Sequence, residues 1–182
     1  YVLKQNGLNP ENDVKMVTNV DFTATAGAFK SGIGDYVALF EPTATMLEKD
    51  GAGNIVSSIG NEAGNISYTC FYTTKSYMDE NPDIIQKFTN AIYKGQQWVQ
   101  QHTSEEVADS IISFFPGTDK EVIVKVIDNY KNIEAYSETP EVSEDGLNKL
   151  MDIIQGYDES LITERPDFNI IVNNSFAKQA IK

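Results

Sequence analysis

The first third of the chain predicts an α/β fold with parallel strands, and three observations carry the prediction. Residues 14–17, 35–40 and 54–56 are short apolar stretches of strand length, bounded by polar or glycine-rich turns. The two intervals between them carry helical signals, so strands and helices alternate along the chain. The connections are short, and this β-α-β-α-β order implies parallel strands with right-handed crossovers.

The order of elements begins with the end of a helix. Residues 1–7 have the pattern of a last helical turn closed by Gly7. Because a native protein rarely begins within a helix and without methionine, we expect a C-terminal fragment of a longer protein. Asp21 or Thr23 can then cap a helix that is closed by Gly32. The apolar face of this helix comprises Phe22, Ala26 and Phe29.

The remaining elements of this first region follow the same alternation. The run 35–40 is continuously apolar, which is typical of a strand covered on both faces. Glu41 and Pro42 interrupt this strand, and 43–49 is a predicted helix stopped by Gly51. The stretch 54–56 described above is then the third strand.

A second region opens with a predicted strand at 68–74 and is almost entirely helical after residue 80. Apolar residues at helical spacing predict its helices, of which the last begins at Ser175. We therefore expect two domains, 1–66 and 67–182. Local cap signals mark two helix starts: Asn81 followed by Pro82, and Thr103 with Glu106 three residues later.

The charge balance excludes one class of partner. The chain has 27 acidic and 14 basic residues, a net charge of −13, and its basic residues are scattered. A protein that binds nucleic-acid phosphates needs clustered lysine and arginine, so we expect no nucleic-acid partner. No apolar run is long enough to predict a membrane span.

The reactive residue types offer little for catalysis. With one cysteine, Cys70, and one histidine, His102, the chain can form no internal disulfide and no histidine- or cysteine-rich metal site, so no cofactor is expected. We expect Cys70 to be a buried, inert thiol on its strand and His102 to be an exposed residue at a helix end. Neither a phosphate-binding glycine loop nor a serine nucleophile elbow is present. A hydrolase using a pair of carboxylates stays open.

Two polar clusters follow predicted strands, where open α/β sheets bind ligands. The first runs into a helix N-terminus, whose free N–H groups suit an anionic or polar ligand group. The second places an aromatic ring beside a carboxylate and a proline turn, a wall suited to a small organic molecule. The alternative is that both are only helix caps and a turn. The first cluster comprises Asn19, Asp21, Thr23 and Thr25; the second comprises Phe40, Glu41 and Pro42.

Two tyrosines extend the candidate site. Tyr68 and Tyr72 are an even number of residues apart on the predicted strand 68–74, so they share one face of it. They could line a ligand cleft, although packing in the core would explain each of them equally well.

Four segments in sequence order resemble the nitrate/sulfonate/taurine-type substrate-binding proteins of ABC importers, a group that includes binders of thiamine pyrimidine precursors. The first is the helix that contains Phe22 and Phe29, followed by glycines and by the strand that opens with Asp35. The second is the aromatic-Glu-Pro turn at 40–42. The third is the helix that begins at Pro82 and runs to Trp98. The fourth is the closing segment 172–180.

The resemblance implies a type II periplasmic-binding-protein-like fold of two α/β lobes, incomplete at its N-terminus. Residues 1–66 would be the remainder of the second lobe, and 67–182 would return to the first. Such proteins are extracytoplasmic, and some of them are lipoproteins. They close their two lobes on a small ligand and perform no catalysis. Their macromolecular partners are the permease subunits of an ABC importer. The N-terminal segment of the same protein would be a further partner, and without it we expect self-association.

Two other functions compete with a solute-binding role. A sensory domain of a receptor would use the same architecture without a transporter. An enzyme related to thiamine pyrimidine precursor synthesis would need a histidine-rich metal site, for which His102 alone is insufficient. The sequence leaves the ligand open among sulfonate, nitrate, bicarbonate and pyrimidine types.

Overall fold

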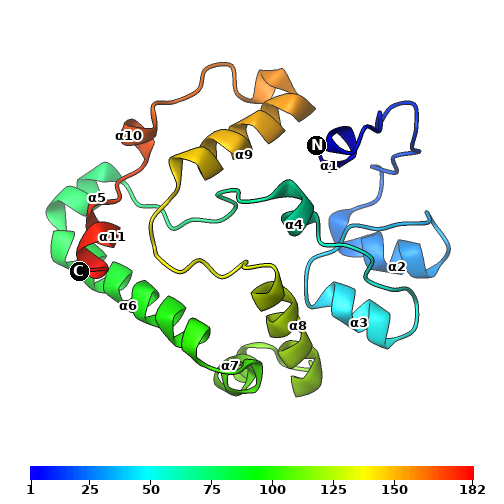
Figure 1. Ribbon diagram of the computed structural model, residues 1–182, viewed down its shortest axis with the longest axis horizontal. Coiled ribbons are helices and arrows are strands. Elements are labelled where there is room, and N and C mark those ends of the chain that lie inside the picture. Colours follow the sequence, from blue (N-terminus) through cyan, green and yellow to red (C-terminus); the bar gives the residue numbers. More distant parts are fainter. The chain divides into compact units, whose positions relative to one another are not determined.

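The computed structural model describes all residues, 1–182, and consists of helices joined by irregular segments, with no β-strand (Figure 1). The helices are α1 (Val2–Gln5), η1 (Phe22–Ala24), α2 (Thr25–Lys30), α3 (Thr43–Lys49), α4 (Ile59–Ala63), α5 (Lys75–Glu80), α6 (Pro82–Gln101), α7 (Ser104–Ile111), η2 (Ile112–Phe114), α8 (Lys120–Asn132), α9 (Glu144–Tyr157), η3 (Glu159–Leu161), α10 (Phe168–Ile171) and α11 (Ser175–Ala180). None of them is long and apolar enough to cross a membrane.

The chain divides into two units, each of which is described by itself. Unit 1 comprises Tyr1, Ala63–His102 and Glu134–Lys182, and unit 2 comprises Val2–Glu62 and Thr103–Ile133. The division into 1–66 and 67–182 stays a prediction about the whole protein.

An apolar core holds unit 2 together. Helices α7 and α8 pack on each other, and α3 packs on α8. Ile123 and Ile127 are the two largest side chains that are almost completely buried. The predicted capping box starts α7: Thr103 Oγ1 accepts from the Glu106 backbone N–H at 3.2 Å, and the Thr103 N–H donates to the Glu106 carboxylate at 2.9 Å. The other buried apolar residues of this unit are Leu47, Val107, Ala108, Val122 and Val126.

Unit 1 has few buried apolar residues and many hydrogen bonds from amide side chains to the backbone. Its buried apolar residues are Ala63, Met151 and Ala177. On the 20-residue helix α6, three glutamine side chains donate to backbone carbonyls of the irregular segment between α8 and α9. Gln96 donates to Thr139 O at 3.1 Å, Gln97 to Glu138 O at 3.0 Å and Gln100 to Tyr136 O at 2.9 Å. Helix α11 packs on α6, and Gln86 donates to Phe176 O at 3.0 Å.

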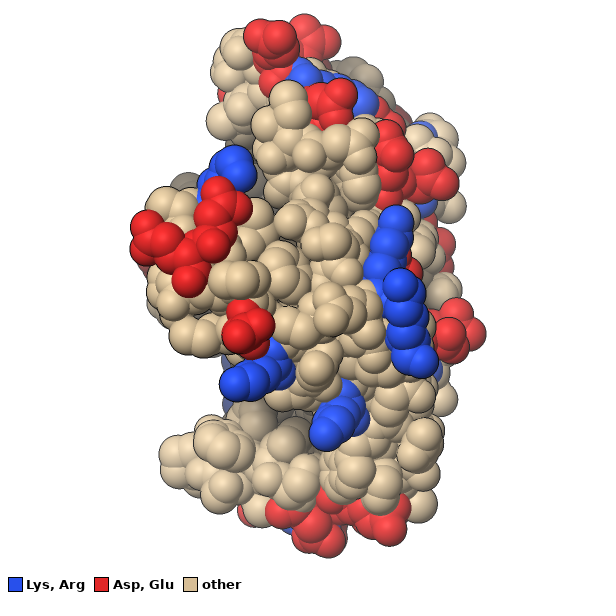
Figure 2. Space-filling view, turned by 90° about the vertical axis from the view of Figure 1, so that its left-hand side faces the viewer, with Lys and Arg blue, Asp and Glu red and all other residues tan.

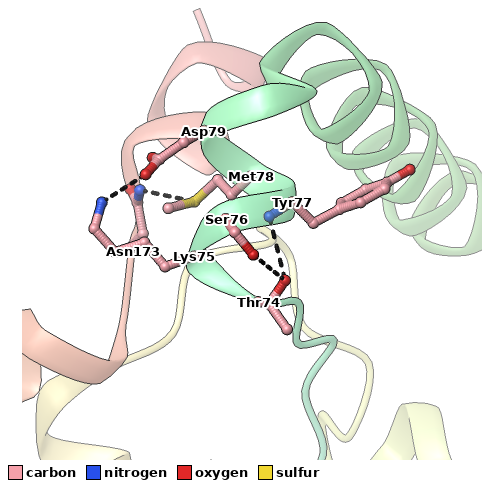
Figure 3. A network of polar contacts seen from close by, with 7 residues as sticks. All are labelled: Thr74, Lys75, Ser76, Tyr77, Met78, Asp79 and Asn173. Atoms are coloured by element: carbon pink, nitrogen blue, oxygen red, sulfur yellow. Dashed lines mark hydrogen bonds and ion pairs between the residues drawn. The ribbon is translucent and has the colours of Figure 1, made fainter.

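Further polar contacts join segments of unit 1 that are far apart in the sequence. The amide of Asn174 exchanges two hydrogen bonds with the backbone of Val142, at 2.9 and 3.0 Å. Figure 3 shows α5, which Thr74 caps by accepting from the Tyr77 N–H at 3.2 Å. In the same view, Asn173 donates to the Met78 sulfur at 3.3 Å. The unit is therefore held largely by directional contacts.

The predicted α/β fold, and with it the type II two-lobe architecture, is wrong for this structure. The expected strands at 14–17, 35–40, 54–56 and 68–74 are irregular segments without strand pairing. A strand exists only when its backbone N–H and C=O groups pair with those of a neighbour. No such ladder forms here. Ile55, for example, donates its N–H to the Glu48 carboxylate at 2.9 Å.

The side chains of these segments explain why the pattern was misleading. The apolar composition of these segments predicts burial in a sheet, but many of their side chains are exposed, with Tyr36 82% and Tyr72 95% accessible. Cys70, expected to be buried, is exposed for the same reason. Apolar runs of strand length carry no information about whether a partner strand is present.

Several predictions that rest on local signals are confirmed, but the Asn81 side chain makes no cap hydrogen bond at the start of α6 and donates to Tyr77 O instead. Helix α3 has the predicted bounds, and the helix end closed by Gly7 is present, with Gly7 at φ 77°. Asp21 caps η1 by accepting from the Thr23 N–H. His102 does end α6, but it is half-buried: its ring stacks on Trp98 with centroids 4.2 Å apart. Figure 2 shows both acidic and basic groups on one face of the molecule, with uncharged surface between them.

Candidate functional site

A hollow of about 310 Å³ in unit 2 is the main concave feature near the predicted site residues. It lies between the start of η1 and α2 on one side and the entry to α3 on the other. A volume of this size is within the range of small-molecule sites. The lining residues are Phe22, Thr23, Thr25, Ala26, Leu39, Phe40 and Thr43.

Two phenylalanine rings form the apolar wall of this hollow. Phe22 and Phe40 meet edge to face, with centroids 5.5 Å apart and an interplanar angle of 61°. The rings remain 60% and 53% exposed, so each keeps a large accessible face. An exposed aromatic pair at the mouth of a hollow can stack on, or enclose, a planar organic group.

Three threonines supply the polar part of the lining. The Thr23 hydroxyl donates to Asp21 Oδ1 at 2.6 Å, and the Thr25 hydroxyl donates to Phe22 O at 2.8 Å. The hydrogen bonds from the Thr23 hydroxyl and backbone N–H lower the pKa of Asp21. Thr43 is the first residue of α3. These threonine oxygens can accept hydrogen bonds from a ligand, and no lysine, arginine or histidine lines the hollow.

Glu41 does not line the hollow, although it follows Phe40 directly. Its carboxylate accepts from the Thr45 N–H at 3.0 Å, the Thr45 hydroxyl at 3.0 Å and Asn129 Nδ2 at 2.8 Å. Thr45 is buried, and Asn129 belongs to α8. The carboxylate therefore caps the start of α3 and ties it to α8, a favourable position for a negative charge at a helix N-terminus.

The neighbouring Tyr130 also contacts this turn. Burial raises the pKa of its phenol, and a hydrogen bond with the Glu41 backbone opposes that effect. Two consecutive residues of α8 thus contact one residue, Glu41. Pro42 precedes the first residue of α3, and the Glu41–Pro42 peptide bond is cis.

The predicted site residues are only partly brought together. Thr23, Thr25 and Phe40 line the hollow, whereas Asp21 stands behind it as a cap. Asn19 is exposed in an irregular segment and does not line it. The role of these residues in binding stays a prediction.

The two predicted tyrosines belong to the other unit. Tyr68 and Tyr72 lie in the irregular segment before α5, in unit 1, and are 63% and 95% exposed. They do not line the hollow. Their role as ligand contacts also stays a prediction.

Three residues of this region were not predicted. The sequence predicts Phe22 only as part of the apolar face of a helix, and its place between Asp21 and Thr23 of the first polar cluster was the available signal. Thr43 was assigned only to the helix that it begins. Asn129 gave no signal, because its contact with Glu41 spans 88 positions of the sequence.

The comparisons with known proteins point to a relative that is named as a binding protein. A curated protein of Bacillus subtilis (strain 168), named "Putative binding protein YtlA", is 40% identical over 179 residues. The match covers 98% of this chain and 53% of that protein, so the chain spans about half the length of this relative. No solved structure matches the chain.

The particular family is the NMT1-like family, to which this chain belongs. Its match covers residues 1–113 and therefore includes every residue that lines the hollow. The resemblance to binding proteins of the nitrate, sulfonate and taurine type is confirmed by this match.

Proposed function

We propose that this protein is the extracytoplasmic solute-binding component of an ABC importer and that the hollow between η1, α2 and α3 contacts its ligand. The observation that carries the proposal is the lining: two exposed phenylalanine rings beside three threonine oxygens, in the segment that matches a family of binding proteins. This is the usual composition of a small-molecule site, mostly apolar with a few polar groups. Permease subunits would be the macromolecular partners.

The charges near the hollow favour one kind of ligand. No cationic side chain lines it, and the nearest ionisable groups along the chain, Asp21 and Glu41, are acids. A sulfonate, nitrate or bicarbonate ion would lose its hydration there without gaining a positive partner. A flat, uncharged ring with N–H donors could stack on the phenylalanines and donate to the threonines. Among the expected ligand types, the pyrimidine type therefore fits best.

A thermal-shift experiment on the full-length protein tests this proposal. We expect 4-aminopyrimidine to raise the unfolding temperature, because a ligand that binds only the folded state stabilises it by mass action. Taurine, nitrate and bicarbonate should give no shift. A shift with one of these anions and none with the pyrimidine would contradict the proposed ligand type. No shift with any of the four would contradict the proposed site.

The matched variants are Phe40→Ala and Tyr36→Ala. Phe40 lines the hollow, whereas Tyr36 is 82% exposed and lies outside it. We expect the first substitution to abolish the pyrimidine-dependent shift and the second to leave it unchanged. Equal shifts in both variants would place the binding elsewhere.

A further inference from the structure

Helix α8 contacts the turn that follows Phe40 through Glu41. Asn129 Nδ2 donates to Glu41 Oε1 at 2.8 Å and lies 3.3 Å from Thr45 Oγ1. Tyr130, the next residue of α8, is hydrogen-bonded to the Glu41 backbone. Side chain and backbone of Glu41 are therefore both fixed by α8.

The position of Phe40 depends on that attachment. Phe40 immediately precedes Glu41, and its ring is 53% exposed and contacts the Phe22 ring. Its carbonyl accepts from the Ala44 N–H at 3.2 Å, in the same turn that the Glu41 carboxylate caps. Loss of the Glu41 contacts would loosen this turn, to which Phe40 belongs.

We infer that Asn129 is a positioning residue for the proposed ligand site: it holds the Glu41 turn so that the Phe40 ring contacts the Phe22 ring in the wall of the hollow. The inference rests on the proposed function for the identity of its ligand. The distance between the Phe22 and Phe40 rings, however, can be measured in the absence of any ligand. A hydrogen bond from a neutral donor to a carboxylate is stronger than one between two neutral groups. Removal of the Asn129 donor should therefore change the conformation of the Glu41 turn.

The first test variant is Asn129→Asp. It preserves size but replaces the donor by a carboxylate facing the Glu41 carboxylate, and two like charges at this distance repel. Other ionisable groups near Asn129 are Tyr130, which contacts the Glu41 backbone, and Asp128, which accepts from the Ser104 hydroxyl. The matched control is Asn132→Asp, which makes the same change at an exposed position of the same helix.

The second test variant exchanges the two groups. In Glu41→Gln combined with Asn129→Asp, the amide at 41 can donate to the carboxylate at 129, which also accepts from the Thr45 hydroxyl. The amide oxygen at 41 can still accept from the Thr45 N–H. The pair is then restored with its polarity reversed, so rescue is expected.

The readout is the NOE between the Phe22 and Phe40 rings in the full chain with labelled phenylalanine. We expect it in the wild type, in N132D and in the exchange variant, and its loss in N129D. With 4-aminopyrimidine as the probe, affinity should fall about tenfold in N129D and return in the exchange variant.

The contrary outcomes are distinct. A ring NOE that persists in N129D while only its unfolding temperature falls would show a merely structural role and overturn the inference, as would equal loss in N132D. If N129D does not fold, the exchange variant decides, and absence of its NOE overturns the inference. If 4-aminopyrimidine does not bind the wild type, the proposed function fails while the NOE still tests the positioning role.

Discussion

The two units are stabilised in different ways. Unit 2 buries a group of aliphatic side chains on α3, α7 and α8, whereas in unit 1 only Ala63, Met151 and Ala177 are buried apolar residues. Unit 1 instead uses amide side chains that bond to backbone carbonyls and N–H groups. Apolar burial is non-directional and tolerates small movements, but hydrogen bonds depend on geometry. The candidate hollow belongs to the unit with the apolar core.

The largest effect is expected in the core of unit 2. Ile127 is 1% exposed on α8, so Ile127→Ala should destabilise this unit by about 2–5 kcal/mol through lost burial and a residual cavity. Hydrogen exchange at the amides of α7 and α8 measures it. Ile59→Ala, at a position of the same unit that is 57% exposed, is the control and should change stability much less. Similar effects of both would mean that the core is not what holds unit 2.

A smaller effect is expected at Asn174 in unit 1. Asn174→Ala removes both hydrogen bonds to Val142 and leaves its half-buried backbone groups without this partner, at a cost of about 1–3 kcal/mol. Faster amide exchange in α11 would report the loss. The control is Asn148→Ala on an exposed face of α9. If the amides of α11 exchange at the same rate in both variants, the hydrogen bonds of Asn174 do not stabilise this unit.

The smallest effect is expected at Gln100. It donates one hydrogen bond to Tyr136 O from an exposed position, so Gln100→Ala should cost only about 0.5–1 kcal/mol. Urea unfolding followed by circular dichroism measures the difference from Gln101→Ala, the adjacent exposed residue at the end of the same helix. A cost well above that at Asn174 would reverse the proposed order.

The parts of the fold that sequence could predict are those fixed by neighbouring residues. The capping box at Thr103, the bounds of α3 and the turn at Gly7 each depend on a few consecutive positions. A strand depends on a partner that is distant in sequence, and the stretches 14–17 and 68–74 have none here. Composition could indicate that these stretches are extended and apolar, but it could not supply the partner.

The candidate site divides in the same way. Thr23, Thr25 and Phe40 were predicted from their places beside helix starts and a turn, and they line one hollow. Glu41 was predicted to face the ligand, but the structure directs its carboxylate to Asn129. That contact depends on how α8 packs on α3, and no local pattern encodes it.

The stacked pair at the end of α6 has a practical consequence for spectroscopy. Trp98 is the only tryptophan of the chain, and both it and His102 belong to unit 1. Intrinsic tryptophan emission therefore reports the surroundings of the end of α6, in the amide-bonded unit. A fluorescence melt and a hydrogen-exchange experiment on the same sample would follow two different events, and the gap between their midpoints would measure how strongly the two units unfold together.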